Sequence, residues 1–133
     1  MSAAPSVTLP APGSTLIGPC DAEDVAQGFF LATEERDCAA GEIFNVGSAY
    51  AVTTGRFAEI YGEIYNSRIN IDWVDWQTYI TKVVPEPGAY YHFQADMCPD
   101  ITRIGSKLGY RPKYTPEQTL QRAVEWMRRE QLL

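Results

Sequence analysis

The sequence is poor in the residues that bind metal ions and nucleic acids. It has one histidine, His92, and its three cysteines, Cys20, Cys38 and Cys98, are too scattered for a C-x-x-C site, so we expect no metal. Positive charge is also scarce, because 11 Lys and Arg residues face 17 Asp and Glu residues, for a formal net charge of −6. Phosphate backbones and anionic membrane surfaces attract basic proteins, so neither is an expected partner.

Long hydrophobic runs are absent as well. Nowhere do about 18 apolar residues follow one another, so no membrane-spanning segment is expected. The N-terminus lacks the positive charge and apolar stretch of a secretory signal, and an odd number of scattered cysteines is typical of reduced thiols. These features predict a cytoplasmic protein. With 133 residues, 45% of them apolar, the chain can form one globular domain with a core.

Proline divides the start of the chain from the rest. Residues 1–14 are rich in proline and poor in large apolar side chains, which predicts an extended N-terminal arm. Residues 15–133 are expected to form a single module that opens with a short edge strand at 15–17. No repeat or low-complexity tract suggests a further domain.

The stretch Gly41–Ser48 organises the prediction of the fold. Its apolar run from Ile43 to Val46 lies between two glycines, which predicts a buried, parallel strand. Helical patterns precede and follow it, as in an α/β layer. A second strand is predicted where Ile69, Ile71 and Trp73 alternate with polar residues, and Phe44 is expected beside Ile71 on neighbouring strands.

Apolar residues at helical spacing predict about five helices, over 21–33, 53–65, from 75 onward, after Pro99, and over 116–131. In the first helix the expected buried stripe is Val25, Phe29 and Ala32, widened by Ala26 and Phe30. The segment Thr115-Pro116-Glu117-Gln118 has the composition of a capping box with proline at the first helical position. We therefore predict an α/β or α+β fold with a small, mostly parallel sheet of two or three strands.

Three motifs in order resemble those of a known family. Glu23-Asp24-Val25-Ala26 is similar to its V-D-D-V-A helix start, 41–47 to its G-E-x-F-N-V-G strand, and 100–112 to its D-x-s-k-a-x-x-x-L-G-w-x-P segment. From about Thr8 onward the chain resembles the C-terminal, substrate-binding portion of the extended short-chain dehydrogenases/reductases, the NAD-dependent epimerase/dehydratase family. The resemblance implies a small-molecule substrate.

The family's cofactor and catalytic motifs are not in this sequence. There is no G-x-G-x-x-G loop of the kind that holds a dinucleotide pyrophosphate. The family's Tyr-x-x-x-Lys pair is also missing, because Tyr79 and Lys82, and Tyr110 and Lys113, have the wrong spacing. The resemblance therefore implies a portion without its Rossmann dinucleotide-binding half. We expect this portion to bind no cofactor and to transfer no hydride by itself.

Two further departures bear on the substrate. Asp21 stands where the family's helix start usually has a histidine, and no Lys or Arg lies between Lys82 and Arg103, where nucleotide-sugar members carry an arginine. A guanidinium is the natural clamp for a diphosphate, so its absence counts against a nucleotide sugar, with Arg103 or Arg56 as the available substitutes.

Six residues are candidates for a site. Tyr91, His92 and Asp96 are the catalytic candidates, because a histidine beside a phenol and a carboxylate can transfer protons at neutral pH. The alternative is a loop that packs its aromatic rings over the sheet, with His92 in solvent. The candidates for substrate binding are Asn45, Tyr90 and Arg103.

Acidic residues at 21, 23 and 24 allow a pair of catalytic carboxylates, but three acids at a helix start also match the helix dipole alone.

Three functions stay open at this point, and so does the question of whether the chain is an enzyme. The first is a truncated epimerase/dehydratase-like module that binds a small polar molecule or complements a separately encoded Rossmann partner. The second is a cofactor-independent isomerase, dehydratase or cyclase whose chemistry rests on His92, Asp96 and a tyrosine. The third is a structural homodimer or partner subunit, since such a module would expose an apolar face that something must cover.

Overall fold

The structure is a computed structural model that describes residues 6–86, 88 and 91–133. The chain forms two compact units, each built from two separated segments. The first unit comprises Met1–Ile17 and Val52–Met97, and the second comprises Gly18–Ala51 and Cys98–Leu133. Helices and strands are mixed, as predicted, and one of the two strand pairs is parallel. That residues 15–133 act as one module stays a prediction.

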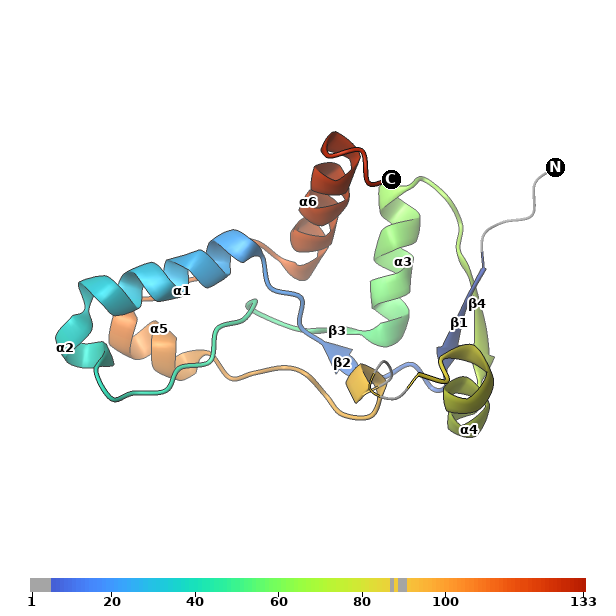
Figure 1. Ribbon diagram of the computed structural model, residues 1–133, viewed down its shortest axis with the longest axis horizontal. Helices are drawn as coiled ribbons and strands as arrows, with labels where there is room; N and C mark the ends of the chain where they lie inside the picture. Colours follow the sequence, from blue (N-terminus) through green and yellow to red (C-terminus); the bar gives the residue numbers. More distant parts are fainter. Residues whose placement is uncertain (1–5, 87, 89–90) are drawn as a thin grey trace. The chain divides into compact units, whose positions relative to one another are not determined.

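Two short strand pairs form the framework of the first unit (Figure 1). Strand β1 (Ser6–Pro10) runs parallel to β4 (Asn70–Val74), with Val7 opposite Ile71 and Leu9 opposite Trp73. Strand β2 (Leu16–Ile17) is antiparallel to β3 (Val52–Thr53). The strands predicted from the alternation at 69–73 and at 15–17 are thus confirmed. The pairing of residues 6–10 within the predicted N-terminal arm is a new finding.

Side-chain caps set the helix starts of the first unit. Helix α3 (Thr54–Ile64) begins at Thr53, whose hydroxyl accepts the Arg56 amide at 3.1 Å. Helix α4 (Trp76–Thr78) begins at Asp75, whose carboxylate accepts the Thr78 amide at 2.9 Å.

A π-helical turn, η1 (Tyr79–Val83), continues α4, and a short 3₁₀ helix, η2 (Tyr91–Phe93), lies further along the chain.

The second unit contains four of the six α-helices in the described part of the chain. These are α1 (Ala22–Glu34), α2 (Arg36–Ala39), α5 (Thr102–Leu108) and α6 (Pro116–Arg129). The predicted capping box is confirmed, because the Thr115 hydroxyl accepts the Gln118 amide and the Gln118 side chain accepts the Thr115 amide. The core is centred on Ile104, Leu108 and Tyr110, and Phe44 and Val46 pack against it.

The prediction of a buried strand at Ile43–Val46 is wrong. Residues 43–46 are extended, but no strand of the described chain pairs with them, and Ile43 is 82% exposed. The expected neighbours therefore separate: Ile71 pairs with Val7, whereas Phe44 has no strand partner among the described residues. A run of apolar residues indicates that a segment favours burial. It does not show whether a neighbouring strand will supply the ladder hydrogen bonds.

The buried stripe predicted for the first helix is also wrong in part. Phe29 and Phe30 of α1 are 73% and 61% exposed, whereas Asp24 and Gly28 face the core. At Gly28 the helix approaches Val46 so closely that a Cβ would lie 2.9 Å from its side chain. The helix is thus rotated so that a carboxylate and a glycine take the inner positions, and the two phenylalanines remain outside.

The carboxylate of Asp24 explains this rotation. Asp24 is fully buried, and its two oxygens accept the backbone amides of Lys113 at 2.8 Å and Tyr114 at 3.2 Å. These bonds tie α1 to the turn that precedes α6, about ninety positions further along the sequence. A buried charge is tolerated only when its hydrogen bonds are made, so the geometry of α1 follows from this contact.

Replacing this carboxylate should destabilise the second unit. We expect Asp24→Asn to lower the free energy of unfolding by about 2 kcal/mol, because the amide group cannot accept both backbone N–H groups. The matched control is Asp37→Asn in the exposed first turn of α2, which should stay within about 0.5 kcal/mol of the native value. Urea unfolding measures both, and equal losses for the two variants would contradict the role given to Asp24.

Candidate functional site

Two of the proposed catalytic residues lie on the segment that runs along β2. The Met97 amide donates to the Leu16 carbonyl at 2.8 Å, and Met97 bridges Ile17. The carboxylate of Asp96 accepts the Leu16 amide at 2.9 Å, so one of its oxygens extends the pairing of the strand. His92 Nδ1 lies 2.8 Å from the sulfur of Met97. The side chains of His92 and Asp96 are both exposed.

The tyrosines of the predicted site are at the edge of what the structure describes. Tyr90 lies outside the described residues. The backbone of Tyr91 forms the first position of η2, and His92 follows it on the same turn. The grouping of Tyr91, His92 and Asp96 as a catalytic set therefore stays a prediction.

Asn45 and Arg103, predicted to bind substrate, belong to the second unit. The Asn45 amide donates to the Asp100 carbonyl at 3.2 Å, which connects the extended stretch to the start of α5. Arg103 pairs with Glu42 and lies over the Phe44 ring, 5.9 Å from its centroid. Lys107 donates to the other Glu42 oxygen at 2.8 Å, and the two cations hold the pKa of Glu42 below its usual value, Lys107 first.

The three acids at the start of α1 have separate structural partners. Asp21 caps the helix by accepting the Glu23 amide at 2.9 Å, and it also binds Arg122 Nε at 2.8 Å. Glu23 accepts from Arg122 Nη2 at 2.6 Å and from the Tyr114 hydroxyl at 2.9 Å. With Asp24 bound to backbone amides, no two of these carboxylates are free to act as an acid–base pair.

Sequence reasoning missed Arg122, which connects these acids to α6. Its guanidinium lies 4.1 Å from the centroid of the Tyr114 ring and contacts two carboxylates from α1. Asp21 is the main reason that the pKa of Arg122 is raised above its ordinary value. Nearly a hundred positions separate Arg122 from Glu23, so no local sequence pattern could have predicted the contact.

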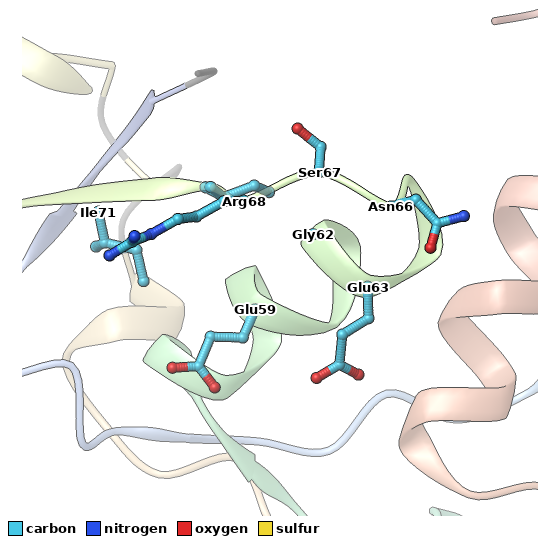
Figure 2. Close-up of a pocket in the computed structure, with 8 residues that line it drawn as sticks. Glu59, Gly62, Glu63, Asn66, Ser67, Arg68 and Ile71 are labelled. Carbon is cyan, nitrogen blue, oxygen red and sulfur yellow. The ribbon is translucent and has the colours of Figure 1, made fainter. Parts of the chain in front are cut away.

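The chain also has a broad polar hollow beside α3 in the first unit. It has a volume of about 540 Å³, and its polar lining includes Glu59, Glu63 and Arg68. Figure 2 shows the two carboxylates on one side of α3, with Ser67 pointing the opposite way. Arg56, on the same helix, binds Glu63 through Nη2 at 3.1 Å and pairs with Glu59 at 3.6 Å. The polar groups therefore do not converge on a common point.

Neither a metal site nor a membrane-spanning helix is found among the described residues. Within the described residues, no three His, Cys, Asp or Glu side chains gather as metal ligands would. The described helices also include none with the length and apolar character needed to cross a bilayer.

Solved structures of sugar-nucleotide enzymes share this fold. UDP-glucose 4-epimerase from Thermotoga maritima, solved with UDP-glucose, matches 95% of the chain with a TM-score of 0.68 and 21% identity. UDP-glucuronic acid 4-epimerase from Bacillus cereus, solved with NAD, matches 94% with a TM-score of 0.69 and 14% identity. dTDP-glucose 4,6-dehydratase from Streptomyces venezuelae matches 96% with a TM-score of 0.65 and 20% identity.

These likenesses define the fold of the chain as part of the epimerase/dehydratase fold. The chain spans about a third of the length of the structures that it matches, 36%, 35% and 35% respectively. No family model and no curated protein matches the sequence. At these identities the likeness establishes the fold of the portion covered.

The ion pairs at the start of α1 predict a pH dependence. The Tyr114 hydroxyl and then Arg122 hold the pKa of Glu23 below its ordinary value, so the folded state binds fewer protons there than the unfolded state does. This stabilisation is present above the unfolded pKa of Glu23 and is lost as the pH falls through the folded pKa. Urea midpoints should therefore fall as the pH drops from about 5 to about 3, and fall less in Glu23→Gln.

The matched control for this measurement is Glu34→Gln at the exposed end of the same helix. It should leave the pH dependence as in the native chain. An equal slope in all three proteins would remove Glu23 as its source.

Proposed function

We propose that this chain is the substrate-side lobe of an epimerase/dehydratase-like enzyme and acts together with a dinucleotide-binding half. The observation that carries the proposal is the unpaired extended stretch Ile43–Val46 in the second unit. The share of the matched enzymes that the chain spans supports it, because two thirds of each of those proteins has no counterpart here. Hydride transfer then belongs to the complete assembly and not to this lobe.

The stretch has the alternating exposure of a strand, but no neighbouring strand of the described chain pairs with it. Exposure alternates from Ile43 to Val46, with Phe44 and Val46 turned to the core and Ile43 and Asn45 turned outward. Among the described residues, no backbone hydrogen bond joins these four residues to another segment. Open N–H and C=O groups on an extended segment are a template for an added strand.

Apolar exposure in the same unit supports the same conclusion. Ile43, Phe29 and Phe30 are among the most exposed large apolar side chains of the described chain, at 82%, 73% and 61%. Burying such side chains stabilises an interface by the area that they remove from water. A dinucleotide-binding half that supplies a strand would satisfy the open backbone and cover apolar side chains together.

The substrate proposed for this lobe is a small polar molecule. Tyr91, His92 and Asp96 are the proposed proton-transfer residues, and Asn45, Tyr90 and Arg103 the proposed binding residues. Arg103 already neutralises Glu42, which weakens it as a clamp for a diphosphate. The residues of this lobe include no glycine-rich loop for the pyrophosphate, so any nicotinamide cofactor would be held by the other half.

The first test is cofactor binding. Residues 1–133 alone, titrated with NADH and NADPH and followed by nucleotide fluorescence, should show no saturable binding and no turnover. The same chain joined to its dinucleotide-binding half, on one polypeptide or on two, should bind one of the two nucleotides. Saturable binding by the isolated chain would contradict the proposal.

A second test addresses the docking surface. Ile43→Lys should change the free energy of unfolding of this chain by no more than about 0.5 kcal/mol, because the side chain is already in water. It should weaken binding to the dinucleotide-binding half by at least about tenfold, since the charge would be buried there. Calorimetric titration measures the affinity.

The matched control is Leu132→Lys, because Leu132 is also a large apolar side chain in water, at 61% exposure. This variant should bind the other half as the native chain does. If the native chain is a stable dimer in sedimentation and Ile43→Lys makes it a monomer, the surface serves self-association instead.

A further inference from the structure

The first unit contains an apolar cavity that the proposed function does not use. Its volume is about 350 Å³, and it lies between helix α3 and the strands of that unit. Four lining residues of α3 recur at helical spacing, and Val7 and Leu9 share one face of β1. The lining residues are Val7, Leu9, Ile17, Thr54, Phe57, Ala58, Tyr61, Ile69 and Phe93.

The chemistry of this lining excludes charged ligands and ordered water. No lining residue carries a charge, and only Thr54 and Tyr61 have polar side-chain atoms. The Thr54 hydroxyl already donates to the Thr15 carbonyl at 3.0 Å. A buried water needs two to four polar partners, so the cavity favours an apolar molecule.

Size and aromatic walls narrow the class of molecule. An apolar cavity of about 150 Å³ holds benzene, so about twice that volume suits two fused rings. Phe57 and Tyr61 meet edge to face, with ring centroids 5.4 Å apart. Phe93, which also lines the cavity, is held edge to face against Tyr79 at 5.4 Å. Fixed aromatic rings favour a flat aromatic partner in offset or edge contact.

Tyr61 contributes its ring and not its hydroxyl to the lining, because the exposed surface of the cavity is apolar throughout. A ligand therefore finds no hydrogen-bond partner in the wall, which favours a molecule without polar groups.

We propose that this cavity binds an uncharged, apolar aromatic molecule of about two fused rings. The site lies wholly in the first unit and needs no dinucleotide-binding half. It is distinct from the polar substrate proposed above, so each of the two proposals can fail without the other.

The probe for the test is naphthalene, with the charged 2-naphthoate as its counterpart. Calorimetric titration of residues 1–133 should show saturable one-to-one binding of naphthalene. 2-Naphthoate should bind at least about tenfold more weakly, because no lining residue can pair with its carboxylate. No saturable binding of naphthalene to the native chain would overturn the proposal, and so would equal affinity for the two probes.

Filling the cavity provides the second arm. Ala58→Leu places three more carbon atoms in the lining and should weaken the binding of naphthalene by at least about tenfold. Ala26→Leu, at an exposed position of α1 in the other unit, is the matched control and should leave the affinity unchanged. If Ala58→Leu binds as tightly as the native chain, naphthalene binds elsewhere and the proposal is wrong. If circular dichroism shows Ala58→Leu unfolded, the comparison of naphthalene with 2-naphthoate on the native chain decides the question.

Discussion

The buried carboxylate of Asp24 is the contact on which the second unit depends. That unit is made from two segments of chain, and nothing in local sequence holds the second segment to the first. Asp24 joins them by accepting two backbone amides in front of α6, at full burial. Because a buried charge must keep these partners, the contact sets the rotation of α1, and the rotation leaves Phe29 and Phe30 in solvent.

Thr15 has the corresponding role in the first unit, which is also made from two segments. Its carbonyl accepts the amide and the hydroxyl of Thr54 at the start of α3, and its hydroxyl donates to the Phe93 carbonyl at 3.1 Å. One residue thereby fixes two lining positions of the apolar cavity. Strand β1, which pairs in parallel with β4, contributes Val7 and Leu9 to the same lining.

Both proposals follow from interactions that the chain leaves unmade. An extended stretch with open backbone groups and exposed Ile43 is poorly satisfied in water, and a strand from another half would complete it. The cavity is unsatisfied in a different way, because its lining atoms lack van der Waals partners on one side. Neither proposal rests on a contact that is present in the structure. Each is inferred from the kind of partner that the chemistry of the stretch or of the cavity requires.

The sequence by itself determined the elements whose signals are local. The helices predicted over 21–33, 53–65, from 75 onward and over 116–131 begin at capping residues in the structure, and alternation at 69–73 predicted β4, because capping and pleating involve neighbouring residues. Tertiary structure alone decided that Ile43–Val46 is unpaired, that Phe29 faces water and that Arg122 binds Glu23. Pairing, rotation and ion pairing depend on segments tens of positions away, and no periodicity within one segment encodes which distant segment will meet it.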